Sequence, residues 1–228
     1  SVSTPEGGQA IVDAAMDAFG RVDIVVNNAG ILRDQAFHKM ESDSINAVID
    51  VHLKGALFVS RPAFAIMREQ GYGRFISTSS ASGLFGNFGQ ANYGAAKAGL
   101  AGLTRVLAIE GASKGIKANA IAPIAATRMT QDLLGDLTEL VTPESVSAVV
   151  AYLANEACAV SGNIYSVGGG RVSRIFIGET PGTVLAANTP EAVASSLDQI
   201  DDTDGFFTPA SLADETAIIH DALNRVSV

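Results

Sequence analysis

Tryptophan is absent from this chain of 228 residues, and cysteine occurs only once, at Cys158. A single cysteine excludes an intrachain disulfide and indicates a reducing compartment, with a buried structural thiol as the expected role. No run approaches the roughly 20 apolar residues that a membrane-spanning helix needs, so no membrane partner is expected. No cluster of His and Cys has metal-ligand spacing, so no metal site is expected either.

Positive charge is also scarce. The chain has 15 Lys and Arg against 24 Asp and Glu, which gives a formal net charge of −9. Without a basic stripe to follow a phosphate backbone, a nucleic-acid partner is not expected. Four aspartates lie in 198–204, but Thr203 and Pro209 stand where an EF-hand calcium loop requires Gly and Glu. We interpret this segment as a solvated acidic loop.

What the chain does contain is typical of a soluble α/β domain. Hydrophobic residues make up 47% of it, and its 23 glycines allow helices to pack closely on a sheet. Short β-branched runs alternate with longer helical patterns, which predicts a parallel sheet. We expect strands at 24–27, 74–78, 117–122, 163–167 and, more weakly, 174–178. We expect helices at 5–19, 42–49, 51–69, 94–109, 143–155 and 190–198.

The candidate chemistry centres on a tyrosine. Ser80 precedes Tyr93 by thirteen residues and Lys97 follows it by four. Residues at i and i+4 share one face of a helix, so the ammonium would lie beside the phenol and lower its pKa from about 10. The spacing alone equally fits a surface Tyr and Lys. The Ala- and Gly-rich helix and the strand before Ser80 favour alcohol–ketone interconversion.

Several motifs occur in an order that resembles the short-chain dehydrogenases/reductases, which are Rossmann-like, doubly wound α/β enzymes that use NAD or NADP. These are the run 27–30 (Asn-Asn-Ala-Gly), Ser80, Tyr93 and Lys97. The stretches 30–34, 50–55, 79–93, 121–123 and 128–130 are similar to one branch. That branch contains the (3R)-hydroxyacyl-CoA dehydrogenase units of peroxisomal multifunctional β-oxidation proteins and their bacterial relatives.

The resemblance implies roles for individual residues. Tyr93 would be the general acid/base, Lys97 would lower its pKa and bind the nicotinamide ribose, and Ser80 would orient the substrate oxygen. His52 stands where most of the family has an asparagine that holds a relay water; it is either part of the catalytic set or a packing residue. The implied cofactor contacts are Asn28, Ala29, Gly30, Tyr93, Lys97, Ala125, Ala126 and Thr127.

The glycine-rich phosphate loop of the family is not found in the chain, nor is the acidic residue that reads the ribose hydroxyls. The run 168–170 (Gly-Gly-Gly) closes a strand and is interpreted as a tight turn. We therefore expect residues 1–170 to be a short-chain dehydrogenase domain without its first three strands, and 171–228 to extend the same domain. Strand 24–27 would then be a sheet edge, and a polypeptide beginning at Ser1 would bind NAD weakly.

The expected activity is interconversion of 3-hydroxyacyl-CoA and 3-oxoacyl-CoA, with NAD favoured over NADP. The alternatives are reduction of a 3-oxoacyl thioester with NADPH, oxidation of another secondary alcohol, or a non-catalytic truncated subunit. Helices 51–69 and 93–109 would pair across a two-fold axis into a homodimer or homotetramer. The end of the chain is not an SKL-type address, so the cytoplasm of a bacterium is expected rather than a peroxisome.

Overall fold

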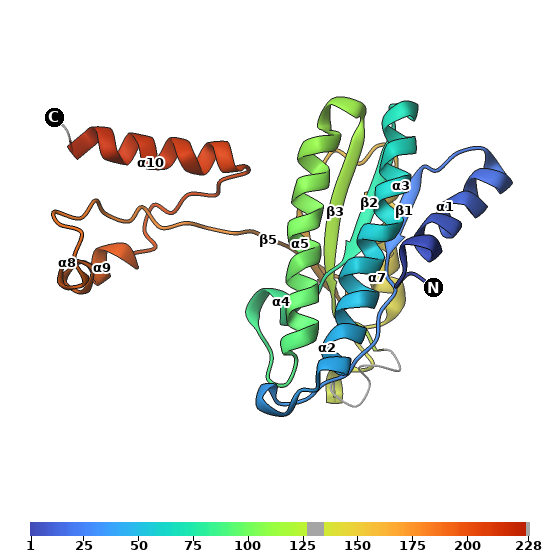
Figure 1. The fold of residues 1–228 in the computed structure, drawn as a ribbon, viewed down its shortest axis with the longest axis horizontal. Helices are drawn as coiled ribbons and strands as arrows, with labels where there is room; N and C mark the ends of the chain where they lie inside the picture. The colour runs from blue at the N-terminus through green and yellow to red at the C-terminus, as the bar shows by residue number, and fades with distance from the viewer. Residues whose placement is uncertain (127–134, 227–228) are drawn as a thin grey trace. The chain divides into compact units, whose positions relative to one another are not determined.

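The computed structural model describes residues 1–126 and 135–226 (Figure 1). The chain divides into two compact units, Ser1–Ile175 and Phe176–Val228. Among the described residues, no helix combines the length and the apolar character needed to cross a membrane.

The first unit is built on one sheet with the strand order β1-β2-β3-β4-β5. Its strands are β1 (Ile24–Asn27), β2 (Gly73–Thr78), β3 (Ile116–Pro123), β4 (Ile164–Gly168) and β5 (Arg171–Ile175). The first four run parallel, and β5 pairs antiparallel with β4. The parallel α/β architecture predicted from the sequence is confirmed.

The fifth strand begins three residues before the predicted 174–178. Gly169 and Gly170 have φ angles of 57° and 79° and form a two-residue turn, after which Arg171 pairs with Gly168. Positive φ at both central residues suits the twist of a tight hairpin, and glycine adopts it without strain. The chain therefore reverses at once and adds an antiparallel edge strand.

Helices cover the two faces of this sheet differently. Helices α1 (Pro5–Phe19), α3 (Gly55–Gln70) and α5 (Ala91–Gly111) lie on one face, where Val25, Phe75 and Ala118 belong to the same buried cluster. Successive side chains of a strand point to opposite faces, so Ile76 and Ile121 meet α7 (Pro143–Ala154) on the other. That second face is less covered at β1, where Ile24 and Val26 are 47% and 45% exposed.

Residues at the two ends of α1 place the helix where the sequence predicted it. The side chain of Thr4 accepts a hydrogen bond from the Gly7 N–H at 3.1 Å, Pro5 occupies the first turn, and Gly20 ends the helix at φ 69°. These residues satisfy helix ends in the usual way. Helix α2 (Ser42–Ile49) also lies at its predicted position.

Two segments near the strand ends differ from expectation. The helix predicted over 51–69 begins as a π-helical turn, η2 (Asp50–Lys54), and becomes α-helical only at Gly55. Between Ser80 and Tyr93, where no helix or strand was predicted, the chain forms a short helix, α4 (Ala81–Phe85). Short 3₁₀ segments complete the unit at η1 (Phe37–Lys39), η3 (Ala112–Lys114) and η4 (Gly135–Leu137). A π turn accommodates one extra residue per turn and is frequent at functional sites.

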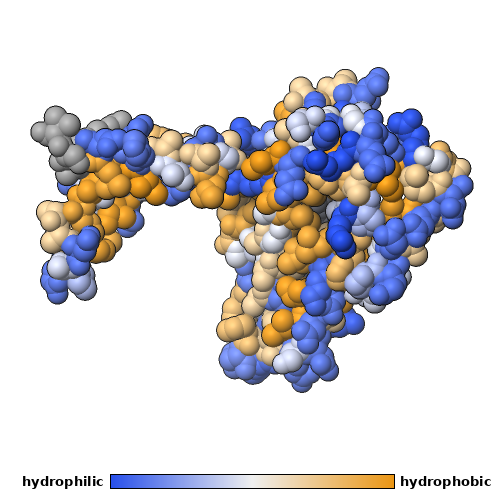
Figure 2. Space-filling model, turned by 45° about the horizontal axis from the view of Figure 1, so that its top comes forward, coloured by the Kyte–Doolittle hydropathy of each residue, from blue (hydrophilic) through white to orange (hydrophobic). Residues whose placement is uncertain are grey.

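The second unit consists mainly of short helices and irregular segments. Its helices are α8 (Pro190–Ser195), α9 (Leu197–Ile200) and the unpredicted α10 (Leu212–Val226). A bridge joins Glu179 to Phe207, and the rings of Phe176 and Phe206 stack at 5.8 Å. The helix predicted at 190–198 is split at Ser196. Figure 2 shows apolar surface gathered on this unit beside a hydrophilic strip.

Candidate active site

The candidate active site lies at the carboxyl ends of β1, β2 and β3. Asn28 follows β1, Ser80 follows β2, and Ala125 follows β3. The hydroxyl of Thr78, at the end of β2, donates a hydrogen bond to Oδ1 of Asn28 at 2.9 Å and joins two of these strand ends. In open parallel sheets this edge is where ligands bind.

Ser80, Tyr93 and Lys97 meet at this edge. Ser80 caps α4, and its Oγ accepts a hydrogen bond from the Ser82 N–H at 3.2 Å. Tyr93 and Lys97 are one turn apart on α5, with Nζ of Lys97 5.4 Å from the centroid of the Tyr93 ring. The Ser80 hydroxyl lies close enough to the Tyr93 phenol to lower its pKa. Residues separated by up to seventeen positions therefore form one polar group.

The side chain of Lys97 is almost completely buried within this group. Its side chain is 3% exposed, and Nζ donates a hydrogen bond to the Thr78 carbonyl at 2.5 Å. Burial disfavours the charged form and lowers the pKa of Lys97 to about 8. The hydroxyl of Ser79 donates to the Lys97 carbonyl at 2.8 Å and so fixes the helix turn to the end of β2.

The pKa of Tyr93 is shifted in the direction opposite to the one predicted. Burial of the half-buried phenol raises the pKa, the hydrogen bond with Ser80 lowers it, and the carboxylate of Asp34 raises it further. The ammonium of Lys97 is directed at the Thr78 carbonyl rather than at the phenol. In this geometry Tyr93 is held as the neutral acid.

His52 lies in the π turn η2, and its ring meets that of Tyr93 edge-on with centroids 5.2 Å apart. Its Nε2 is 2.9 Å from the Ile31 nitrogen and 2.8 Å from the Ile31 carbonyl oxygen, while Nδ1 is buried and has no hydrogen-bond partner among the described residues. Burial and the charge of Lys97 lower the pKa of His52 to about 4, so the ring is neutral near pH 7.

Because Gly30 has no side chain, the loop after β1 can pass close to the His52 ring. A Cβ at position 30 would lie 2.3 Å from Cε1 of His52, a distance that no real side chain adopts. The loop after β1 therefore requires glycine here to stay in contact with the ring.

Three further polar residues, which the sequence interpretation did not assign, hold the loop after β1 against the start of α5. Asn92 is 3% exposed and donates to the carbonyls of Arg33 at 3.0 Å and Ser44 at 3.2 Å. Nε2 of Gln90 donates to Asp34 Oδ2 at 2.7 Å. The sequence signal for these contacts was the pair of amide residues just before Tyr93, Gln90 and Asn92. Amide side chains in loops commonly form hydrogen bonds with nearby backbone groups.

Two cavities flank the end of β1. The larger, of about 460 Å³, is lined by Asn28, Thr78 and Ala125 together with apolar residues of β3 and α7. The smaller, of about 170 Å³, is lined by Asn28, Ala29 and His52 among others. The larger volume is within the range of small-molecule sites. Ala126 donates its N–H to the Val141 carbonyl at 2.7 Å, and Thr127 lies outside the described residues.

Comparison with known proteins identifies the family. Residues 1–137 match the family described as short chain dehydrogenase. The chain belongs to this family. A short-chain type dehydrogenase/reductase of Mycobacterium tuberculosis is 56% identical over 178 residues, which are 78% of this chain and 62% of that protein. An acetoacetyl-CoA reductase of an Acinetobacter strain is 42% identical over 72% of this chain and 71% of its own length.

The fold of this short-chain dehydrogenase is shared with a solved structure. The full-length peroxisomal multifunctional enzyme type 2 of Drosophila melanogaster superimposes with a TM-score of 0.82 at 33% sequence identity. The match covers 96% of this chain and 44% of the fly chain. The chain thus spans less than two thirds of the mycobacterial protein and less than half of the fly enzyme.

Proposed function

We propose that this short-chain dehydrogenase interconverts 3-hydroxyacyl and 3-oxoacyl thioesters, with Tyr93 as the proton-transfer group. The observation that carries the proposal is the placement of Ser80, Tyr93 and Lys97 at the carboxyl edge of parallel strands, with Nζ of Lys97 5.4 Å from the centroid of the Tyr93 ring. A phenol held beside a hydroxyl and a cation can exchange a proton with a substrate oxygen.

The two directions make different demands on Tyr93. In reduction the neutral phenol donates its proton to the 3-oxo oxygen, and the raised pKa keeps that proton available at pH 7. In oxidation the phenol must first lose its proton and then accept the one from the 3-hydroxyl, and the positive charge of Lys97 stabilises the phenolate. Ser80 donates its hydroxyl hydrogen to the same substrate oxygen and so orients it. His52 supports the set by its contact with the Tyr93 ring.

A nicotinamide cofactor fits the larger cavity, whose mainly apolar lining and three polar residues, Asn28, Thr78 and Ser147, suit a flat ring with an amide. The cofactor would supply the hydride acceptor or donor at carbon 3. We propose NAD rather than NADP. The residues assigned to hold it are Asn28, Ala29, Gly30, Tyr93, Lys97, Ala125, Ala126 and Thr127.

Three observations support the proposed substrate, oligomeric state and location of the protein. The Acinetobacter relative is an acetoacetyl-CoA reductase, which favours an acyl-CoA substrate. The outer surfaces of α3 and α5 expose Leu57, Val106 and Ile109, and space is open at Gly102, which favours a homodimer or homotetramer through these helices. The relationship to bacterial proteins favours a bacterial cytoplasm over a peroxisome as the location.

The test is the Tyr93→Phe variant of the complete protein, which loses only one oxygen atom. Oxidation of 3-hydroxybutanoyl-CoA with NAD should fall by about 10²–10⁴-fold while the unfolding transition stays unchanged. Tyr152→Phe is the matched control, because Tyr152 is 51% exposed on α7, and it should keep full activity. More than about a tenth of the wild-type rate in Tyr93→Phe would show that another group transfers the proton.

A further inference from the structure

Exposed phenylalanines gather on the two loops that border Tyr93. Phe85 is the last residue of α4, the helix that Ser80 caps, and it is 72% exposed. Phe88 lies in the loop between α4 and α5 and is 90% exposed. Phe37 begins η1, in the loop after β1, and is 75% exposed. All three are therefore within a few residues of a group assigned to the site.

The loops that carry these rings are fixed by hydrogen bonds. The Gln35 N–H donates to the Gly89 carbonyl at 2.9 Å, which places the segments of Phe37 and Phe88 side by side. Asn87 Nδ2 donates to Gln90 Oε1 at 3.0 Å, and Gln90 donates onward to Asp34 at 2.7 Å. Gln90, at the start of this network, caps α5 three residues before Tyr93.

Glycine turns on both sides hold Phe88 outward. Gly86 and Gly89 have φ angles of 82° and 78°, which other residues rarely adopt. The exposure of Phe88 is thus built into the turn. Large exposed apolar side chains on loops held by hydrogen bonds are typical of surfaces that bind an apolar partner.

The chemistry of a 3-hydroxyacyl thioester calls for such a surface. Carbon 3 has to meet Tyr93 and Ser80, and from it the polar thioester and the apolar alkyl chain leave in different directions. The larger cavity is assigned to the cofactor, so the alkyl chain needs apolar surface elsewhere beside Tyr93. The three phenylalanines supply it where their loops adjoin the catalytic residues.

We infer that Phe37, Phe85 and Phe88 form a docking surface for the alkyl chain and give the enzyme a preference for acyl groups longer than four carbons. The inference rests on the proposed function, because it assumes a thioester whose carbon 3 reacts at Tyr93. Each methylene covered by the rings adds to the binding free energy, so selectivity rises with chain length.

The experiment compares the complete protein with its Phe88→Ser and Phe85→Ser variants on 3-hydroxydecanoyl-CoA and 3-hydroxybutanoyl-CoA with NAD. The readout is the ratio of kcat/KM for ten carbons to kcat/KM for four. Each variant should lower this ratio about tenfold, the loss expected when an aromatic contact to the chain is removed. Phe19→Ser is the control: Phe19 is 78% exposed at the end of α1, and this variant should leave the ratio within about twofold.

A binding measurement separates this inference from the proposed function. Decanoyl-CoA, which has no 3-hydroxyl, is titrated into each protein by calorimetry, and Phe88→Ser should bind it about tenfold more weakly than the wild type. Wild-type binding without oxidation of either substrate refutes the proposed reaction alone. An unchanged ratio and unchanged binding in both variants refute the docking surface. So does a loss of the oligomer by light scattering in step with the loss of the ratio, since the rings would then be a subunit contact.

Discussion

Arg74 and Lys97 are two buried cations at opposite ends of the same strand. Arg74 is near the amino end of β2 and is 4% exposed, whereas Lys97 contacts the carboxyl end of β2 and is 3% exposed. Burial is thus the same, and neither has a carboxylate partner among the ion pairs of the described residues. What differs is how many oxygen atoms each cation meets.

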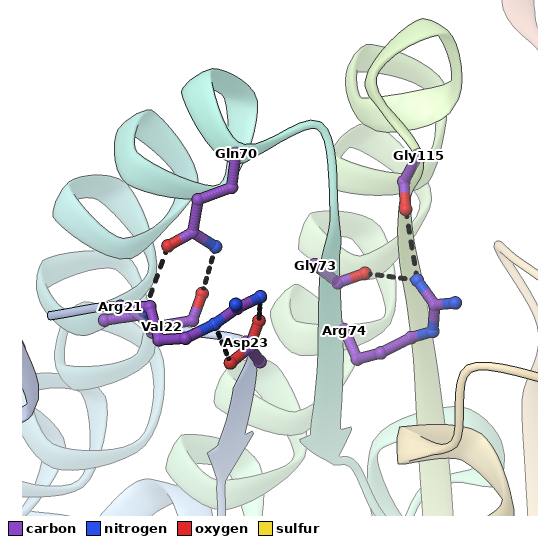
Figure 3. Close-up of polar contacts among 7 residues, drawn as sticks. All are labelled: Arg21, Val22, Asp23, Gln70, Gly73, Arg74 and Gly115. Atoms are coloured by element: carbon purple, nitrogen blue, oxygen red, sulfur yellow. Dashed lines mark hydrogen bonds and ion pairs between the residues drawn. The ribbon is translucent and has the colours of Figure 1, made fainter. Parts of the chain in front are cut away.

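The guanidinium of Arg74 is surrounded by carbonyl groups. It donates to Gly73 at 2.8 Å, Gly115 at 3.0 Å, Glu156 at 3.1 Å and Asn155 at 3.2 Å, and it lies 4.3 Å from the Tyr72 ring centroid. Figure 3 shows the first two bonds. Asn155 and Glu156 follow the end of α7, where free carbonyls and the helix dipole favour a cation. Arg74 thus joins a helix end and a turn to the central sheet.

The amino end of the sheet has further polar contacts that join separate segments of the fold. Gln70 accepts from the Val22 N–H at 3.1 Å and donates to the Val22 carbonyl at 2.7 Å, and Arg21 forms a two-point ion pair with Asp23 (Figure 3). At the carboxyl end, by contrast, Nζ of Lys97 has three hydrogens and, within the part of the chain that the structure describes, a single protein hydrogen bond. The difference separates a cation that stabilises the fold from one that is available to a substrate or cofactor.

The largest expected effect comes from Lys97→Met. Activity toward 3-hydroxybutanoyl-CoA should fall by at least about 100-fold, because the proposed mechanism requires a positive charge beside Tyr93 when the phenol loses its proton. The free energy of unfolding at pH 7 should stay equal or increase, since a poorly solvated charge is removed from the interior. Activity assays and urea denaturation of the complete protein measure the two quantities.

The sign of the pH dependence gives a second measure of the same variant. The pKa of Lys97 is lowered from 10.5 to about 8, so between these values the unfolded chain binds more protons than the folded one. Wild-type stability should therefore rise as the pH increases through this window, and Lys97→Met should lack that rise. Lys114→Met, at an exposed position in η3, is the control for a lost surface charge. Destabilisation of Lys97→Met by more than about 1 kcal/mol at pH 7 would contradict the comparison.

Arg74→Met should have the opposite profile. Removal of the guanidinium takes one donor from each of four carbonyls, of which Asn155 still accepts from the Cys158 N–H, and we expect the free energy of unfolding to fall by about 3 kcal/mol. The folded fraction should keep its kcat, because the active site is at the other end of the strands. Arg21→Met, which removes the exposed ion pair with Asp23, should change stability little. A loss of kcat without a loss of stability in Arg74→Met would reverse the roles assigned to the two cations.

The sequence predicted the carboxyl end of the sheet far better than the amino end. Ser80, Tyr93 and Lys97 have fixed spacings that local geometry and family motifs both report, and β1 and α2 begin and end where their patterns indicated. Arg74 was read only as the first residue of a strand. Its four partners come from Gly73, Gly115, Asn155 and Glu156, and no local pattern links positions that far apart.

Other differences have equally physical reasons. The extra residue of the π turn η2 does not change the apolar spacing enough to be seen, so 51–69 reads as one continuous helix. The pKa direction of Tyr93 depends on burial and on Asp34, a residue of a distant loop. Helix α10 was missed although its apolar residues are spaced as in α1, because no family motif anchors the chain after Arg171.

His52 is a third buried basic residue, to be compared with Arg74 and Lys97. Its substitution has the smallest expected effect of the three. It is 3% exposed like Lys97, but it avoids the cost of burial by being neutral, with a pKa of about 4 instead of 6.5. Between these two values the unfolded chain binds more protons, so stability is lost as the pH falls from 6.5 to 4. We expect this residue to account for about 2 kcal/mol of the acid destabilisation, less than the full shift because the folded state relaxes.

The test is urea denaturation of the wild type, His52→Asn and His38→Asn at pH 7 and pH 4.5. His52→Asn should be less stable than the wild type at pH 7, because Asn cannot fill the space between Ile31 and Tyr93, and the two should converge toward pH 4.5. His38→Asn changes an exposed histidine in η1 and should follow the wild type at both values. Parallel losses in the wild type and His52→Asn would mean that the pKa of His52 is the same in the folded and unfolded states. The folded protein would then accept the charged ring without cost, and His52 would no longer belong with the neutral groups that shape the site.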